Sequence, residues 1–297
     1  MSDNKTMLKT IALTLTTLLL SFSIHAKPNQ VIQPISENAK TRFEIQQYDL
    51  AGEDKSQYRI FVAVPRTPAP AGGYPVLYLL DGNNTFPMAV NGYLPVNGDA
   101  PLIIAIGYPG DTAYNQEART RDYTPAAPGE EFAKGGNAED FFLFINQKLK
   151  PWASARYAID MKRQTLSGHS FGGLFTLYTL FNHTDEFQHY VAASPSIWWG
   201  NGIVIPSRTP LLNTKPKSIT ITVGEFEEKP EPANAAKPED PQRVKRKAER
   251  QQVTKARDLV ATLKQQGNNV NFIMFAGKNH GTVIPDAVNT AVMVAGQ

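Results

Sequence analysis

A serine flanked by small residues is the strongest candidate for chemistry in this sequence. Ser170 lies in the run Gly168-His169-Ser170-Phe171-Gly172, which has the pattern Gly-x-Ser-x-Gly. This pattern is typical of a sharp turn from a strand into a helix, in which small residues let the chain reverse and the serine oxygen projects above a sheet. An apolar run precedes the motif and a helical run follows it. We therefore predict that Ser170 is a catalytic nucleophile; the alternative is a purely structural turn.

A serine hydroxyl needs a base that removes its proton, and one histidine is well placed to be that base. His280 follows the apolar segment Val270–Phe275 and would therefore lie in a loop at a strand end. His169 is next to the serine in sequence, but at such a turn its side chain is expected to point away. His183 and His189 surround a later turn and are expected to have surface or capping roles. His280 is thus the predicted base.

The histidine in turn needs an acceptor that fixes its tautomer and stabilises the imidazolium ion. The predicted strand Ser218–Val223 lies between the serine and the histidine, and an acidic stretch follows it. In the chain order Ser, acid, His, this stretch should supply the acid. We favour Glu227, with Glu225 as the second candidate. Glutamates that merely face water, and a Ser–His pair without an acid, remain open alternatives.

The negative oxygen of a tetrahedral intermediate requires two backbone N–H donors. We expect one from Phe171, which follows the predicted nucleophile, and one from Asn83, in the loop after the apolar segment Val76–Leu80. Gly82 would permit the turn that this loop needs. A turn without a catalytic role is the competing interpretation.

Two further clusters are candidates for substrate binding. Arg119 and Arg121 lie close to Tyr123, and guanidinium groups bind carboxylate, phosphate or catecholate oxygens and stack on rings. Trp198 and Trp199 follow a predicted strand end. The alternatives are a surface loop held by an Arg–Asp pair for the first cluster, and a plug in the core for the second.

The elements that must position these residues alternate along the chain. Apolar runs predict strands at Phe43–Leu50, Tyr58–Pro65, Val76–Leu80, Leu102–Gly107, Thr165–Ser167, Tyr190–Ala193, Ser218–Val223 and Val270–Phe275. Helices are predicted at Glu139–Leu149 with Asn137 as its cap, at Phe171–Phe181, at Gln242–Gln266 and at the end of the chain. The first two strands should form an antiparallel pair. The alternation predicts an α/β fold, with a mainly parallel central sheet and helices on both faces.

Domain boundaries and export are read from the composition of the chain. Residues 1–26 have a basic start, an apolar run at Ile11–Leu20 and a small residue, Ala26, at a candidate cleavage point, as a secretory signal does. We therefore expect a signal peptide at 1–26, one hydrolase domain at 27–297 and a periplasmic or secreted protein. The proline-rich stretch Glu227–Pro241 is expected to be an exposed loop.

Charge and composition exclude several classes of protein. The 297 residues carry a formal net charge of only +3 and include no cysteine. A basic nucleic-acid binder, a thiolate metal site and a cysteine nucleophile are therefore not expected. No metal, cofactor or membrane partner is implied, and the expected partner is a small-molecule ester.

Taken in order, these segments resemble the esterase D and enterochelin-esterase group of α/β-hydrolases. The matching pieces are LLDGN at 79–83, RDYTP at 121–125, the run that ends in SGHSFGG at 155–173, SPSIWW at 194–199, GEFE at 224–227 and GKNHG at 277–281. With the export signal, the chain is most similar to the periplasmic siderophore esterases of this group. The resemblance implies a serine esterase that opens enterobactin-like catecholate trilactones, free or ferric. Ser170 and His280 carry over, and Glu227 does so in part, because some members use a Ser–His pair.

Two other functions remain to be weighed against a siderophore esterase. A carboxylesterase for acetyl, feruloyl or other simple esters, or an acyltransferase, would use the same residues. A binding protein on an inactive hydrolase scaffold is disfavoured because Ser170, His280 and both motif glycines are intact.

Overall fold

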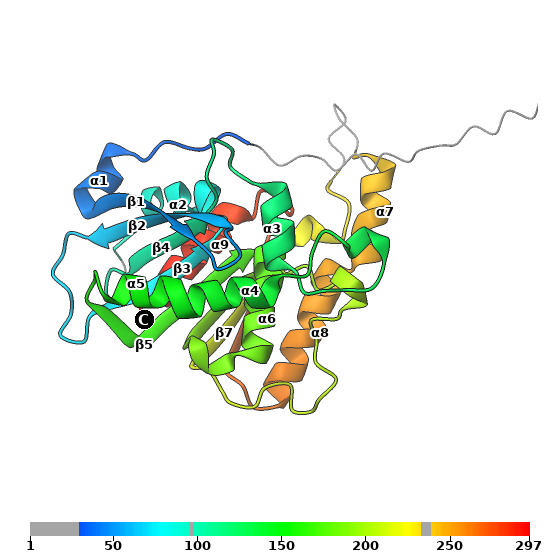
Figure 1. The fold of residues 1–297 in the computed structure, drawn as a ribbon. Coiled ribbons are helices and arrows are strands. Elements are labelled where there is room, and N and C mark those ends of the chain that lie inside the picture. The colour runs from blue at the N-terminus through cyan, green and yellow to red at the C-terminus, as the bar shows by residue number, and fades with distance from the viewer. Residues whose placement is uncertain (1–29, 96–97, 233–238) are drawn as a thin grey trace, which may run out of the picture.

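The computed structural model describes residues 30–95, 98–232 and 239–297, which form a sheet of eight strands covered by helices on both faces (Figure 1). The strands are β1 (Phe43–Ala51), β2 (Gln57–Pro65), β3 (Tyr74–Leu80), β4 (Leu102–Gly107), β5 (Ile159–His169), β6 (His189–Ala193), β7 (Ser218–Gly224) and β8 (Val270–Phe275). Their order in the sheet is β1-β2-β4-β3-β5-β6-β7-β8. β1 and β2 are antiparallel, β2 is antiparallel to β4, and all other neighbours are parallel. The predicted fold class and antiparallel first pair are confirmed.

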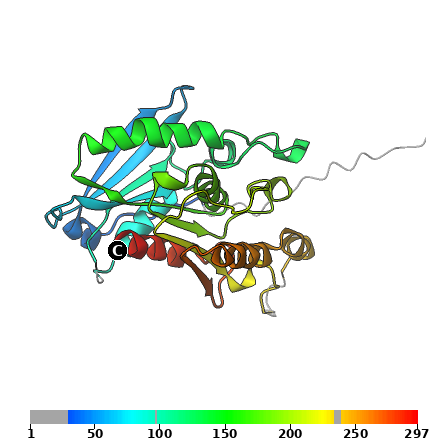
Figure 2. The same cartoon turned by 90° about the horizontal axis from the view of Figure 1, so that it is seen from below.

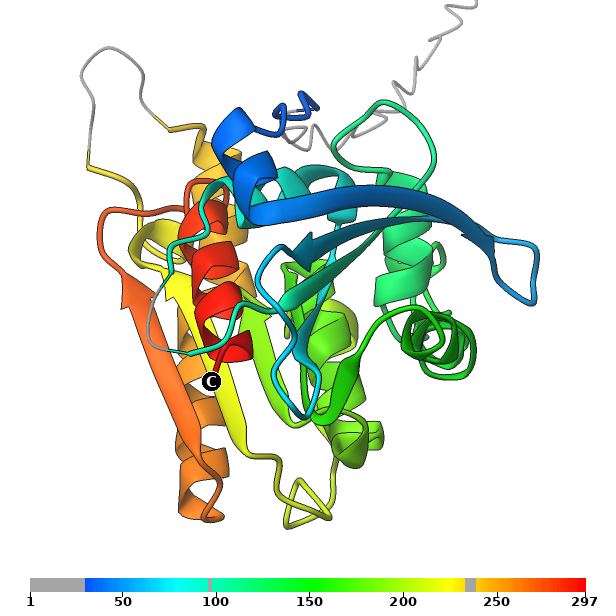
Figure 3. The ribbon, with the colours of Figure 1, turned by 90° about the vertical axis from the view of Figure 1, so that its left-hand side faces the viewer.

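The central strands are apolar on both faces because helices cover both faces. Every residue of β3 (YPVLYLL) and β4 (LIIAIG) is buried, as expected for strands in the middle of such a sheet. Helices α1 (Glu37–Arg42), α2 (Gly82–Asn91) and α9 (Ile284–Ala295) cover one face. Helices α3 (Gln116–Tyr123), α4 (Ala138–Leu143), α5 (Lys150–Ser154), α6 (Phe171–Asn182) and α8 (Gln252–Gln265) cover the other. Figure 2 shows α4 and α5 on the opposite side of the sheet from α9, and Figure 3 shows α9 crossing in front of the strands.

Three helix predictions differ from the structure in detail. The segment predicted at Gln242–Gln266 is two helices, α7 (Pro241–Arg250) and α8, because Gln251 adopts a left-handed conformation with φ 48° that ends the first. The segment predicted at Glu139–Leu149 continues beyond α4 through a π-helical stretch into α5. Asn137 precedes α4, but its side chain makes no capping hydrogen bond.

The parallel strands determine where the loops meet. Because β3, β5, β6, β7 and β8 run in the same direction, the segments that follow them emerge at one edge of the sheet. The expected signal peptide at 1–26 lies outside the described residues. Among the residues that the structure describes, no helix is long and apolar enough to cross a membrane.

Candidate active site

Ser170 occupies the sharp turn between β5 and α6. Its backbone has φ 61° and ψ −114°, a conformation that non-glycine residues rarely adopt and that is frequent at functional sites. The turn is possible because the neighbouring glycines are in close contact with the backbone. A Cβ on Gly168 would lie 2.5 Å from the carbonyl of Gly172, and one on Gly173 would lie 2.5 Å from the carbonyl oxygen of Ala193. Larger residues at these positions would prevent the turn that presents Ser170.

His280 joins Ser170 to a buried carboxylate. The His280 Nε2 atom is 2.9 Å from Ser170 Oγ, and its Nδ1 atom is 2.7 Å from Glu227 Oε2. The second oxygen of Glu227 accepts hydrogen bonds from the hydroxyl of Ser194 at 2.5 Å and from the backbone N–H of Gly224 at 2.6 Å. The imidazole of His280 is therefore held on both sides, and Glu227 is itself held by two further hydrogen bonds. These contacts fix the orientation of the imidazole.

The two glutamates that competed for this position have different partners. Glu227 lies within a short turn directly after β7 and is buried. Glu225 accepts a hydrogen bond from the backbone N–H of Gly277 at 2.9 Å and so supports the loop that carries His280. A Cβ on Gly224 would lie 2.6 Å from the carbonyl oxygen of Lys278, so glycine lets the two loops approach. Of the two, the structure brings Glu227 to His280.

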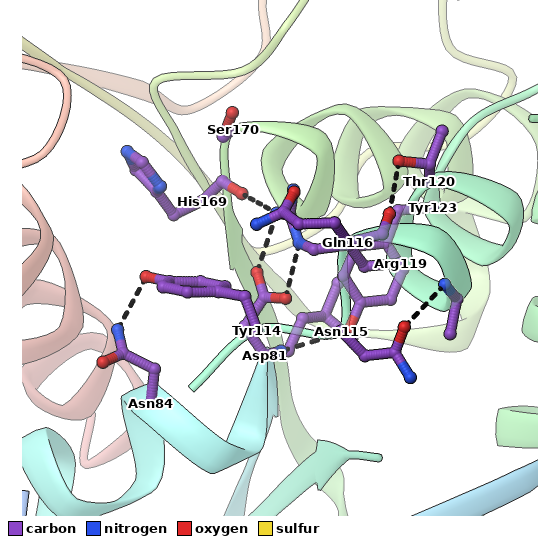
Figure 4. Close-up of polar contacts among 12 residues, drawn as sticks. Asp81, Asn84, Tyr114, Asn115, Gln116, Arg119, Thr120, Tyr123, His169 and Ser170 are labelled. Carbon is purple, nitrogen blue, oxygen red and sulfur yellow. Dashed lines mark hydrogen bonds and ion pairs between the residues drawn. The ribbon is translucent and has the colours of Figure 1, made fainter. Parts of the chain in front are cut away.

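On the other side of the elbow, a buried ion pair joins the end of β3 to α3 (Figure 4). Arg119 donates from Nε and Nη2 to the two carboxylate oxygens of Asp81, at 2.8 and 2.9 Å. Its Nη2 atom also lies 3.5 Å from the carbonyl oxygen of His169, directly before the serine. Burial opposes the charged form of Arg119, but the adjacent Asp81 outweighs it and the net effect raises the pKa of Arg119. A closed, buried ion pair therefore lies beside the elbow.

Three residues predicted to bind substrate have structural contacts instead. Arg119 is buried against Asp81 rather than open to a ligand. Tyr123 is fully buried, and its hydroxyl accepts a hydrogen bond from the backbone N–H of Asp81. Trp199 is buried and donates to the carbonyl oxygen of Pro125. An aromatic or basic residue near a strand end can fill the core or line a site, and in this structure all three residues pack in the interior.

The remaining predicted residues have mixed outcomes. Arg121 forms two hydrogen bonds with Asp122, and among the described residues no contact links it to Ser170. The side chain of Asn83 is bound to the backbone of Tyr108 at the end of β4. Its backbone N–H, which is the predicted oxyanion donor, lies in the first turn of α2, directly after β3, and stays a prediction.

Phe171 and Trp198 both lie next to the proposed nucleophile. Phe171 is the first residue of α6, and its ring is 6.0 Å from that of Trp198, which is only partly buried. Of the three aromatic residues predicted to bind substrate, Trp198 is the one with exposed surface near the elbow.

His169 is a neighbour of the site that the sequence did not assign. Its ring was expected to point away from the serine, and it does so by packing against the ring of His280, with 4.6 Å between centroids. Burial, the adjacent His280 and the charge of Arg119 together hold the pKa of His169 well below its ordinary value. His169 is therefore a neutral imidazole behind the proposed base. In the sequence, only its position next to Ser170 associated His169 with the site, and this position did not indicate the contact with His280.

Two more residues that the sequence did not assign border the elbow. Ser196 has its hydroxyl oxygen 3.4 Å from that of Ser170, and its backbone N–H donates to the Ser170 carbonyl oxygen at 3.2 Å. The guanidinium carbon of Arg250 lies 4.0 Å from the centre of the Trp198 ring. Ser196 lies in the segment between Ser194 and Trp199, whereas Arg250 is far away in sequence and could not have been associated with the site by spacing.

The fold and the Ser–His–Glu chain define an α/β-hydrolase. The description "putative esterase" belongs to the family whose model matches residues 53–276. The chain belongs to this family and is an esterase.

Similar proteins of known name agree with this assignment. The chain is 36% identical to the ferri-bacillibactin esterase BesA of Bacillus subtilis over 262 residues. This match covers 80% of this chain and 84% of that protein. It is 32% identical to the apo-salmochelin esterase of Escherichia coli O6:H1, over 62% of each chain. The solved structure of the BES protein from Bacillus cereus superimposes with a TM-score of 0.71 at 29% identity, over 89% of this chain and 97% of that one.

Proposed function

We propose that the protein is a serine esterase that hydrolyses the ester bonds of a catecholate siderophore, an enterobactin-like trilactone in its free or ferric form, and so releases iron. The observation that carries the proposal is the hydrogen-bonded chain from Ser170 through His280 to the buried Glu227. The choice of ester is supported by the names of the relatives, which act on bacillibactin and salmochelin. Export from the cytoplasm, expected from residues 1–26, is part of the proposal.

The mechanism follows from the atoms that are in contact. Ser170 Oγ attacks the ester carbonyl carbon while His280 Nε2 accepts its proton. His280 then donates that proton to the leaving alcohol, which leaves an acyl group on Ser170. A water molecule attacks the acyl carbon, again with His280 as base, and releases the acid. Glu227 stabilises the imidazolium ion that forms in both halves.

Stabilisation of the oxyanion is assigned to backbone N–H groups at the beginnings of two helices. The backbone N–H of Phe171 is at the N-terminus of this helix, where N–H groups lack intrahelical acceptors. The second donor that we propose is the backbone N–H of Asn83, which lies in the first turn of α2, another helix N-terminus.

The experiment is hydrolysis of ferric enterobactin by the purified protein, with linear trimer, dimer and monomer followed by mass spectrometry. We expect all three products from the wild type and none above background from Ser170→Ala, with both proteins folded by circular dichroism. Equal product from both would refute the proposal. Rapid cleavage of short nitrophenyl esters without cleavage of the trilactone would instead identify a carboxylesterase for simple esters.

A further inference from the structure

The wall of the active site on the β6 side contains an arginine with an unusual set of contacts. Arg250 is the last residue of α7, and its guanidinium group lies over the indole of Trp198, 4.0 Å from the ring centre. Within the part of the chain that the structure describes, no carboxylate or other hydrogen-bond acceptor contacts its side chain. Arg119, on the other side of the elbow, has both oxygens of Asp81. Among the described residues, Arg250 therefore has no hydrogen-bond acceptor for its donors, whereas Arg119 has two donors occupied by Asp81.

Three contacts link Arg250 to the residues that border the proposed nucleophile. The backbone N–H of Ser196 donates to the carbonyl oxygen of Ser170, and the same segment continues to Trp198. The Trp198 ring is 6.0 Å from that of Phe171, which follows Ser170 directly. Gln252 holds the helix junction against this segment, because its side-chain amide donates to the carbonyl oxygen of Pro195 at 2.6 Å in a buried hydrogen bond. The guanidinium group is thus anchored at the rim of the site.

The location of Arg250 is unfavourable for a cation without a partner. Burial, with the nearby Arg246 as a second cause, lowers the pKa of Arg250. A charge that is partly removed from water and has no counter-ion is destabilising until an anion pairs with it. Its position at the C-terminus of α7 suits the helix dipole, but the dipole does not require a stack on Trp198. An anionic ligand at this rim would satisfy the free donors.

We infer that Arg250 and Trp198 form a subsite for one deprotonated catecholate ring of the substrate, and this inference rests on the proposed function. The two adjacent oxygens of a catecholate lie in one plane and match the planar fork of donors of a guanidinium group. The exposed part of the Trp198 ring and the neighbouring Phe171 ring provide apolar surface for the aromatic ring. A short uncharged ester would use neither feature. The subsite therefore distinguishes catecholate esters from simple esters at one and the same nucleophile.

The test compares Arg250→Gln with a matched variant of the same helix. Lys245 is exposed, at 78% of its side-chain surface, and its distant partner Glu249 is 3.8 Å away, so Lys245→Gln removes the same charge outside the subsite. We measure KM and kcat for the trilactone, and the inhibition constant of the iron(III) complex of 2,3-dihydroxybenzamide, a deprotonated catecholate without a carboxylate, against nitrophenyl butyrate hydrolysis. Arg250→Gln should raise both KM and the inhibition constant about tenfold, which is about 1.4 kcal/mol. Arg250→Lys, which keeps the charge and loses the planar fork, should give an intermediate value.

The kinetics on the trilactone test the proposed function, and the inhibition constant tests the subsite. The inhibition constant is measured on a simple ester, so it reports the subsite even if the trilactone is not a substrate, an outcome that would refute the proposed function alone. An inhibition constant equal in Arg250→Gln and the wild type would overturn the inference. Equal increases in Arg250→Gln and Lys245→Gln would also overturn it, because they would show a general effect of charge.

Discussion

The proposed nucleophile lies between two buried carboxylates that are held in similar ways and have different partners. Glu227, on the β7 side, and Asp81, on the β3 side, are each 4% exposed. Glu227 accepts from a ring nitrogen of His280, and Asp81 accepts two hydrogen bonds from Arg119. Histidine gains and loses a proton near neutral pH, whereas arginine stays charged at all working pH values.

This difference separates chemistry from architecture within one site. The Glu227–His280 pair can change its charge during the reaction, because the proton of Ser170 moves to the ring and away again. The Asp81–Arg119 pair keeps one charge state and carries no net charge, so it serves as a fixed link between β3, α3 and the elbow. Removal of the two carboxylates should therefore damage different properties of the protein.

The largest effect is expected on activity at the Glu227 side. Glu227→Gln removes the charge that stabilises the imidazolium ion, and kcat should fall about 10,000-fold, the loss that follows when a triad carboxylate becomes an amide. Steady-state kinetics on nitrophenyl butyrate measures it. Glu225→Gln is the matched control, because Glu225 binds the backbone N–H of Gly277 and not the imidazole, and its kcat should stay much closer to that of the wild type. Equal losses in the two variants would contradict the assignment of the acid.

At the Asp81 side, the largest effect is expected on stability. Asp81→Ala leaves Arg119 buried and unpaired, and the free energy of unfolding should fall by about 3–5 kcal/mol. Urea unfolding measures the change, and the double variant Asp81→Leu/Arg119→Met should recover much of the loss.

The control for this stability effect is an ion pair at the surface. Asp49 pairs with Arg59 across β1 and β2 and is 49% exposed, so Asp49→Ala should cost about 1 kcal/mol or less. A loss of the same size in Asp81→Ala would show that the buried pair has no special role.

The smallest effect concerns the neutral imidazole that lies between the two sides. The pKa of His169 is depressed in the folded protein by burial, by His280 and by Arg119, so below about pH 6.5 the unfolded chain binds a proton that the folded chain resists. The stability contributed by His169 is thus present above this pH and is lost as the pH falls toward its depressed pKa. Unfolding free energies measured between pH 7.5 and 5 should therefore show a shallower slope in His169→Gln than in the wild type.

A second buried histidine serves as the comparison for this slope. The pKa of His189 is also lowered, mainly by burial, but its ring binds Ser218 away from the elbow. His189→Gln should therefore flatten the slope while activity is kept, whereas His169→Gln should also reduce activity because it removes the ring behind His280. An unchanged slope in His169→Gln would refute the electrostatic account.

Much of the fold and part of the site could be predicted because they depend on local patterns. Apolar runs located all eight strands, and the order of buried and amphipathic segments indicated a parallel sheet. The glycines around Ser170 indicated the turn, and the loop positions of His280 and Glu227 followed from strands that end at one edge. The break at Gln251 could not be predicted, because a non-glycine residue in the left-handed region is decided by packing on either side.

The sequence by itself therefore determined which strand each candidate catalytic residue follows. The serine lies at the end of β5, the candidate acids follow β7 and the histidine follows β8. Only the tertiary structure decided which basic and aromatic residues are buried and which face the site. Arg119, Tyr123 and Trp199 had the composition of a binding site but lie in the core, and Arg250 lies at the rim although it is 80 positions from Ser170. The physical reason is that a guanidinium group or an aromatic ring is compatible with either environment. Its partners, which come from distant segments, determine whether it is held or left free.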